Sequence, residues 1–226
     1  MKLAESMQFG EELEDLKYAW RLCRKARKRG VFRPFCAWPI EVNTDTGYIY
    51  RHNGLCFIVA DGSDNFREWL VNFFWIRWGR DKVAAGFLRA AYGFAEAADK
   101  LLYIDDLIVL IGHSRGGFIQ KTAIELSRLG YCIESVITFG SPKMGGRKFC
   151  DSMADIFHVR VFSHDDPVPD LPRLRGKHYE SLAVTFPRRR DVLGFTRMSR
   201  FVRGVVDHLS YGSLLKGKTE WNYSRK

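Results

Sequence analysis

One serine in this sequence has the surroundings that a catalytic nucleophile needs. Ser114 lies in Gly112–Gly117, which reads Gly-His-Ser-Arg-Gly-Gly and contains the pattern G-x-S-x-G. The apolar run Leu107–Ile111 precedes this turn, and the amphipathic segment Phe118–Leu129 follows it. A strand, a tight turn and a helix in this order expose the serine hydroxyl at a helix N-terminus, where a developing oxyanion is favoured. The pattern predicts attack by Ser114 on an acyl carbonyl.

A carboxylate must orient the base that activates this serine. A serine turn of this kind is the nucleophile elbow of an α/β-hydrolase. In such enzymes the three catalytic residues follow one another along the chain as serine, then aspartate or glutamate, then histidine. The loop after the apolar run 157–162 offers Asp165, Asp166 and Asp170. Asp166 precedes Pro167, which favours an extended backbone and helps to fix its direction. Spacing alone leaves the choice between Asp165 and Asp166 open.

The base must be a histidine that follows the acid, which leaves His178 and His208. His178 follows the acid loop closely and leaves little chain for another strand and turn. His208 lies near the end of the chain, on a loop that enters a predicted helix, and is therefore favoured. We expect the other histidines to be structural or at the surface, with His113 packed inside the elbow: His52, His113, His158 and His164.

These groups need a scaffold in which strands and helices alternate. Periodicity and turn residues predict helices over 11–29, 83–102, 118–129 and 147–153, and strands over 40–42, 47–51, 55–60, 107–111, 135–139, 157–162 and 182–186. The first three strands are separated by hairpin-type turns and are expected to be antiparallel. The alternation predicts an α/β fold of the α/β-hydrolase type, with a mixed, mostly parallel central sheet flanked by helices. We expect a single domain over 1–226, in which 1–30 contains an N-terminal helix packed on the rest.

Composition narrows the kind of protein. The 226 residues carry a net charge of +10, which favours contact with something anionic such as a membrane surface, or is simply a basic surface. No signature of a nucleic-acid-binding module accompanies this charge. Neither a transmembrane stretch nor a secretory signal is evident, so the expected location is cytoplasmic or unknown. The five cysteines show no metal or disulfide spacing, so we expect free thiols, no metal and no cofactor. The sequence does not predict an oligomeric state.

Several motifs in the same order make this chain similar to the class 3 lipases, a family that includes the triacylglycerol lipases of filamentous fungi. The resemblance covers roughly residues 55–215. It rests on Ile58–Ser63 followed by Trp69, Val83–Phe87, Gly112–Gly117, Thr138–Gly145, Asp165–Pro172 and Asp207–Tyr211.

The resemblance implies roles for individual residues. Ser114 would be the nucleophile, Asp166 rather than Asp165 the acid, and His208 the base. The oxyanion hole would use Ser63 and the backbone N–H of Arg115. Arg115 stands where the family usually has leucine, and a guanidinium at the mouth of the site would favour an anionic head group.

The resemblance also implies a lipid or other acyl-ester substrate and a two-step ester hydrolysis. Residues 66–78 correspond to the region that carries a lid in similar lipases, although a core helix fits the same pattern. The expected function is a lipase or esterase acting on acylglycerols or related esters, in transient contact with an anionic membrane or lipid interface. Two alternatives are a phospholipase A1 or lysophospholipase acting on anionic lipid, and a catalytically silent lipid-binding protein with a lipase-like fold.

Overall fold

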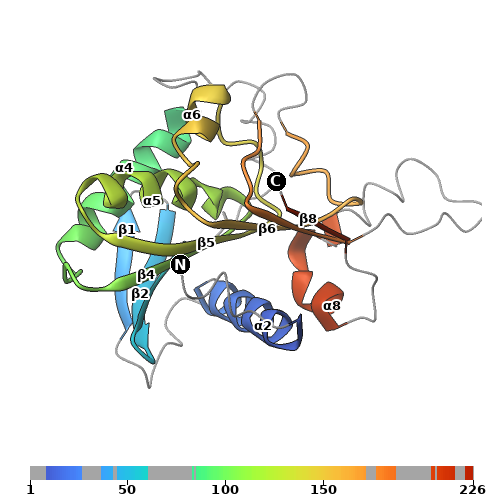
Figure 1. Ribbon diagram of the computed structural model, residues 1–226, viewed down its shortest axis with the longest axis horizontal. Coiled ribbons are helices and arrows are strands. Elements are labelled where there is room, and N and C mark those ends of the chain that lie inside the picture. The colour runs from blue at the N-terminus through green and yellow to red at the C-terminus, as the bar shows by residue number, and fades with distance from the viewer. Residues whose placement is uncertain are drawn as a thin grey trace, which may run out of the picture.

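An eight-stranded mixed sheet organises the chain, with its strands in sequence order from β1 to β8 (Figure 1). The computed structural model describes residues 9–26, 37–42, 45–60, 83, 85–171, 177–186, 205–206, 208–216 and 222–225. The strands are β1 (Ala37–Val42), β2 (Asp45–His52), β3 (Leu55–Ala60), β4 (Leu107–His113), β5 (Cys132–Phe139), β6 (His158–Ser163), β7 (Leu182–Phe186) and β8 (Asn222–Arg225). Strands β3 to β7 run parallel, whereas β1, β2 and β8 pair in the antiparallel sense at the edges.

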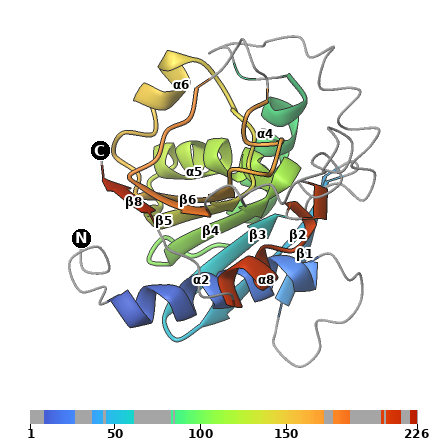
Figure 2. The ribbon, with the colours of Figure 1, turned by 90° about the vertical axis from the view of Figure 1, so that its right-hand side faces the viewer.

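Helices cover both faces of this sheet (Figure 2). One face carries α4 (Ala85–Asp99), α5 (Ile119–Arg128) and the short α6 (Arg147–Asp151). The other face carries α2 (Phe9–Ala26) and α8 (Tyr211–Lys216). The helices of the described ranges include none that is long and apolar enough to cross a membrane.

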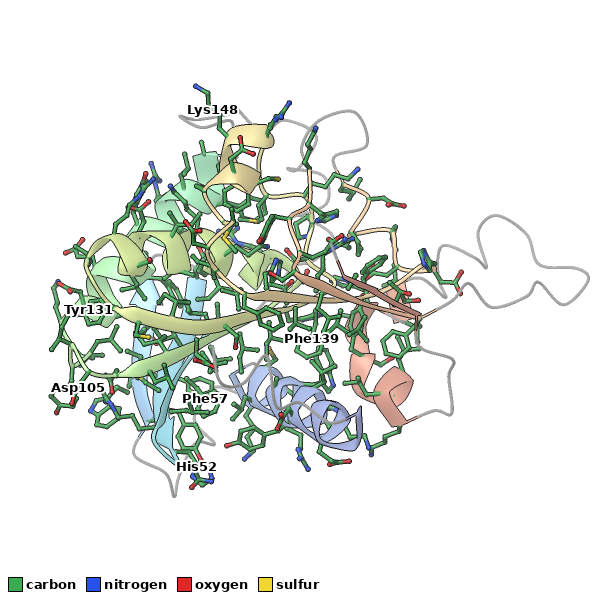
Figure 3. The ribbon with its side chains drawn as sticks, viewed as in Figure 1. His52, Phe57, Asp105, Tyr131, Phe139 and Lys148 are labelled. Carbon is green, nitrogen blue, oxygen red and sulfur yellow. The ribbon has the colours of Figure 1, made fainter. Side chains whose placement is uncertain are left out.

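Strand β4, in the centre of the sheet, is apolar from Leu107 to Ile111, and its residues from Ile108 onward are buried. Successive side chains of a strand point to opposite faces of the sheet. Ile108 and Leu110 of β4 therefore join the core under α4 and α5, whereas Val109 and Ile111 join the core under α2 and α8. Phe139 of β5, which is labelled in Figure 3, belongs to this second core. Burial on both faces is typical of parallel strands covered by helices.

The predicted fold class is confirmed: the sheet is mixed, its centre is parallel, and helices flank it. Strand β7 has the predicted bounds, and the first three strands are antiparallel as expected. The N-terminal helix packs on the sheet through Leu16 and Trp20. It begins at Phe9, before the predicted start at Glu11, and the last predicted residues, 27–29, lie outside the described ranges. Strand β8 was not predicted.

The predicted helix over 118–129 is confirmed as α5, whose caps are Phe118 and Leu129. A 3₁₀ helix, η2 (Ser114–Phe118), comes directly after β4, and α5 begins only at Ile119. The nucleophile turn thus passes into a tight helical turn before the regular helix begins. The candidate lid 66–78 and Ser63 lie outside the described residues.

Candidate active site

Ser114 occupies a strained turn at the carboxyl end of β4. Its φ is 54°, a left-handed value that a residue with a Cβ adopts at a cost. Gly112 allows the turn to close, because a Cβ there would lie 2.2 Å from the carbonyl oxygen of Gly116. Gly117 is equally confined, since its Cβ would lie 2.1 Å from Ser141 Oγ. The glycines of the motif let the strand, the turn and the helix approach one another closely.

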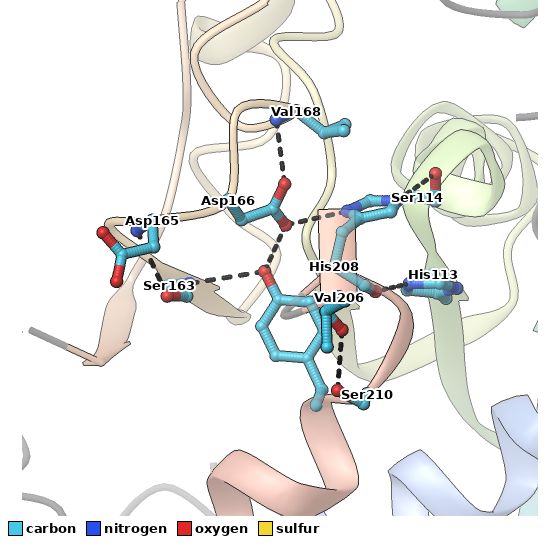
Figure 4. Close-up of polar contacts among 10 residues, drawn as sticks. His113, Ser114, Ser163, Asp165, Asp166, Val168, Val206, His208 and Ser210 are labelled. Carbon is cyan, nitrogen blue, oxygen red and sulfur yellow. Dashed lines mark hydrogen bonds and ion pairs between the residues drawn. The ribbon is translucent and has the colours of Figure 1, made fainter. Parts of the chain in front are cut away.

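Three side chains from distant segments meet at this turn (Figure 4). Ser114 Oγ lies 2.7 Å from His208 Nε2, and His208 Nδ1 lies 2.7 Å from Asp166 Oδ2. Since a carboxylate only accepts, Nδ1 carries the proton and Nε2 is free to accept from the serine hydroxyl. All three residues are buried: Ser114 is 4% exposed, Asp166 3% and His208 0%. Asp166 follows β6 and Ser114 follows β4, so both lie at the carboxyl ends of parallel strands, where open α/β sheets bind ligands.

Two further donors hold the Asp166 carboxylate. The backbone N–H of Val168 donates to Oδ1 at 2.9 Å, and the Tyr211 hydroxyl donates to Oδ2 at 2.6 Å. Burial, and after it the nearby Asp166 charge, raises the pKa of Tyr211 well above its usual value, so the phenol stays protonated. Tyr211 begins α8, three residues after His208. It belongs to the motif Asp207–Tyr211, but sequence reasoning gave it no role.

His113 supports the backbone of His208. Its Nε2–H donates to the carbonyl oxygen of His208 at 2.8 Å, and the two rings lie 4.9 Å apart. Trp20 of α2 packs edge-on against His113 at 5.0 Å between ring centroids. His113 is therefore packed inside the elbow as expected. It links the N-terminal helix to the segment that carries His208, which is helical at 208–209 and not the loop that the sequence predicted.

Gly140, directly after β5, lies against the same group. Its φ is 55°, and a Cβ there would lie 2.8 Å from Asp166 Oδ2 and 2.9 Å from His208 Nδ1. Only glycine meets both conditions without strain. Sequence reasoning placed Gly140 in a family motif but not at the site, because the contact involves two segments that are remote in the chain.

The competing residues lie elsewhere. Asp165 is close in sequence, but its side chain points away from His208 (Figure 4). Asp170 is exposed. His178 donates from Nε2 to the carbonyl of Pro169 at 2.6 Å, and burial lowers its pKa to about 2. His178 thus braces the loop that carries Asp166 and does not contact Ser114 in the described structure.

The side chain of Arg115 binds a carboxylate of the protein itself, which the sequence did not predict. Its Nε and Nη2 donate to Oδ1 and Oδ2 of Asp45 at 2.7 and 2.6 Å. A guanidinium held in this way has its charge balanced, so the expectation that Arg115 favours an anionic head group was wrong in its physical basis. Its backbone N–H still follows the serine, where an oxyanion donor is expected. Ser63, the other predicted donor, lies outside the described residues.

Within the described ranges, no three His, Cys, Asp or Glu side chains gather closely enough to hold a metal ion. The cysteines in those ranges are not joined in disulfides: Cys23, Cys56, Cys132 and Cys150.

A serine on a strained strand–helix turn, facing a histidine in a mixed sheet covered by helices on both faces, defines the α/β-hydrolase class. Comparison with known families refines this assignment. Residues 57–176, more than half of the chain, match the family Lipase (class 3). The chain belongs to this family.

Two relatives show how far the similarity extends. The chain is 31% identical over 153 residues to secreted mono- and diacylglycerol lipase 1 of Fusarium solani, a match that covers 58% of the chain and 45% of the relative. It is 37% identical over 81 residues to lipase A of Sodiomyces alcalophilus, covering 29% of the chain and 20% of the relative. The chain thus spans less than half the length of the curated relatives it matches.

Solved structures share the fold at low identity. A deletion mutant of Rhizomucor miehei lipase in complex with its propeptide gives a TM-score of 0.69 at 19% identity, covering 91% of this chain and 80% of that one. Lip2 lipase from Yarrowia lipolytica gives a TM-score of 0.69 at 19% identity, covering 91% and 94%. At this identity the likeness shows the fold alone.

Proposed function

We propose that this protein is a serine carboxylic-ester hydrolase that cleaves acyl esters such as acylglycerols. The observation that carries this proposal is the continuous contact from Ser114 Oγ through His208 to Asp166 Oδ2. The Nε2 atom of His208 faces the serine hydroxyl and its Nδ1 atom faces the carboxylate. A general base between a nucleophile and an orienting carboxylate requires this arrangement. Membership of the class 3 lipases supports the same chemistry.

In the first step, Ser114 attacks the ester carbonyl while His208 Nε2 takes the hydroxyl proton. Asp166 holds the ring in the required tautomer and stabilises the imidazolium that forms. The tetrahedral oxyanion is bound by the backbone N–H of Arg115 and by Ser63, as in the elbow of similar enzymes.

In the second step, His208 returns its proton to the leaving alcohol, and an acyl-enzyme remains on Ser114. Water, deprotonated by the same imidazole, then hydrolyses the acyl-enzyme and frees the fatty acid. The chemistry requires one serine, one imidazole and one carboxylate, and no cofactor enters either step.

Acylglycerols are the substrates we favour, because the Fusarium relative is named a mono- and diacylglycerol lipase. A fungal lipase–inhibitor complex with the same fold is described as a model for interfacial activation in lipases. Ser114 is buried here, and an enzyme that opens at a lipid surface would expose it there. The lid over 66–78 stays a prediction, as does contact with an anionic interface through the net charge of +10.

The location of the protein also stays a prediction. The Fusarium relative is named a secreted lipase, whereas the sequence favoured a cytoplasmic or unknown location. Tracking the protein in the cells that make it, with and without its first residues, would decide between them.

The test is hydrolysis of a series of p-nitrophenyl esters from acetate to palmitate, and of emulsified monoacylglycerol and diacylglycerol, by wild type and Ser114→Ala. We expect turnover in wild type that disappears in the variant. Turnover that survives in Ser114→Ala, or a folded wild type that hydrolyses neither set, would overturn the proposal. Activity confined to phospholipid vesicles would favour the phospholipase alternative, and lipid binding without turnover would favour the silent lipid-binding one.

A further inference from the structure

The ion pair between Arg115 and Asp45 lies next to the proposed nucleophile. It consists of two parallel hydrogen bonds between the guanidinium and the carboxylate. Both oxygens of Asp45 accept from the guanidinium, at 2.7 and 2.6 Å. A two-pronged guanidinium–carboxylate pair sets an angle as well as a distance, which a single contact does not. The Asp45 side chain is only 8% exposed and that of Arg115 23%, so water competes weakly for either partner.

This pair crosses the carboxyl end of β3. Gly47 of β2, Ala60 of β3 and Gly112 of β4 are register partners in one row across the sheet. Asp45 lies beyond this row on β2, and Arg115 follows Gly112 in the nucleophile turn. The Arg115 side chain therefore spans from the end of β4 to the start of β2 and connects two segments that the sheet keeps one strand apart.

The residue that this pair holds is the one whose N–H is proposed to bind the oxyanion. Helix η2 begins at Ser114, so the N–H of Arg115 belongs to a first turn, whose donors have no partner within their own helix. Its direction depends on the backbone angles of Ser114 and Arg115. An anchored Arg115 side chain restricts those angles, because a backbone rotation must either be absorbed by the side-chain torsions of Arg115 or strain its two hydrogen bonds to Asp45.

We propose that Asp45 is a positioning residue which, through Arg115, holds the oxyanion-binding N–H in its productive direction. This inference rests on the proposed function of the Ser114 site. Among the described residues, the hydrogen bonds of the Asp45 side chain go to Arg115 and not to Ser114, His208 or Asp166. Its effect on catalysis is therefore expected in kcat, which reports transition-state stabilisation, and not in KM.

The chain contains a matched control at the opposite end of β2. Arg51 makes the same two-pronged pair with Asp106, at 3.0 and 2.6 Å. The exposed fractions are also alike, 24% for the Arg51 side chain and 11% for Asp106. Asp106 precedes β4, so this pair lies at the amino end of the parallel strands, away from Ser114. Loss of either pair removes a two-pronged ion pair from the same strand. Asp106 has one further role, since it also accepts from the backbone N–H of Tyr103 at 2.8 Å.

The experiment measures kcat, KM and the melting temperature of wild type, Asp45→Asn, Asp106→Asn, Arg115→Leu and the double variant Asp45→Asn/Arg115→Leu, with p-nitrophenyl butyrate. We expect Asp45→Asn to lower kcat by roughly tenfold to a hundredfold, as for a misdirected oxyanion donor, with KM within about twofold of wild type. Asp106→Asn should lower the melting temperature about as much as Asp45→Asn does. Its kcat should stay within about twofold of wild type. The double variant should lose no more than the worse single variant, because both single changes break one interaction.

Two results would overturn the inference alone. One is an active wild type whose kcat is unchanged in Asp45→Asn. The other is a loss of kcat in Asp106→Asn as large as in Asp45→Asn, which would mark a general effect of stability. A wild type that hydrolyses no ester would overturn the proposed function and this inference with it.

Discussion

Three donors hold the carboxylate of Asp166: the Nδ1–H of His208, the hydroxyl of Tyr211 and the backbone N–H of Val168. His208 and Tyr211 belong to one C-terminal segment, and Val168 belongs to the loop of Asp166 itself. Hydrogen bonds to a charged group are stronger than those between neutral groups. The carboxylate is therefore fixed in direction before any substrate arrives, and so is the imidazole that it orients.

We expect Tyr211→Phe to lower kcat/KM by roughly tenfold, because Asp166 Oδ2 loses one charge-assisted hydrogen bond while the ring stays in place. Ester hydrolysis and circular dichroism would measure activity and folding together. Tyr131→Phe is the matched control, since Tyr131 donates to Asp99 Oδ1 at 2.8 Å on the surface. Activity within twofold of wild type in Tyr211→Phe would contradict this role.

Gly140→Ala should abolish most of the activity. The new Cβ would adopt a left-handed φ and press on Asp166 Oδ2 and His208 Nδ1. The conformational cost is about 1–2 kcal/mol, and separation of the two groups should lower kcat by roughly a hundredfold or more.

Gly130→Ala separates these two causes. Gly130 also has a left-handed φ of 97°, but the nearest atom to its Cβ would be Ile104 Cδ1 at 3.9 Å. Gly130→Ala should lose only the conformational part of the stability, about 1–2 kcal/mol in urea unfolding, and keep full activity. Equal activity in the two variants would show that crowding at Gly140 does not matter.

Among the helices, α2 connects the N-terminal part of the chain to the site. Trp20 contacts His113 and Tyr211 by edge-on ring packing. Its indole also lies close to the backbone of α8, because a Cβ added to Gly212 would lie 2.5 Å from the indole nitrogen of Trp20. The helix therefore packs against α8 and the elbow together. Its burial against the sheet agrees with the packed helix that the sequence predicted.

Trp20→Ala should lower the free energy of unfolding by about 3–5 kcal/mol, since a large buried side chain leaves a cavity. Activity should fall as well, because His113 loses the ring that holds it against His208. Urea unfolding and ester hydrolysis at a temperature where the variant is folded would measure both. Trp20→Phe, which keeps an edge-on ring, should recover most of each loss, and a fully active, stable Trp20→Ala would contradict the link.

The order of the elements followed from sequence because each strand and helix carries its own apolar periodicity. Ser114 was predictable for the same reason, since its glycines and the flanking strand are adjacent in the chain. Gly140 and Tyr211 acquire their roles only when segments remote in sequence meet at Asp166. The pair of Arg115 with Asp45 escaped prediction because nothing local to either residue indicates its partner, and charge alone suggested a ligand.

The whole molecule should be sensitive to acid because its folded state keeps two histidines neutral, His158 fully buried and His178 partly buried. Burial lowers the pKa of His158 to about 4 and that of His178 to about 2. In the unfolded chain both titrate near the ordinary value of about 6.5. Below that pH the unfolded state binds more protons than the folded state, so stability falls as the pH drops toward each folded pKa.

We expect the free energy of unfolding to decline below about pH 6.5, each histidine contributing a slope that approaches ~1.4 kcal/mol per pH unit. Urea unfolding between about pH 7 and pH 4.5 would measure this slope. The amide of His178→Gln can still donate to the Pro169 carbonyl. This variant should lower the slope by the contribution of one proton, ~1.4 kcal/mol per pH unit. A slope unchanged in that variant would contradict the assignment.

The central claim is that His208 and Asp166 activate Ser114, and covalent labelling tests it most directly. The protein would be treated with a fluorophosphonate, and the adduct located by mass spectrometry in wild type, Ser114→Ala and His208→Ala. We predict one phosphonyl group on Ser114 in wild type, none in Ser114→Ala, and labelling slowed by orders of magnitude in folded His208→Ala. An unlabelled, folded wild type, or equally fast labelling without His208, would contradict the account.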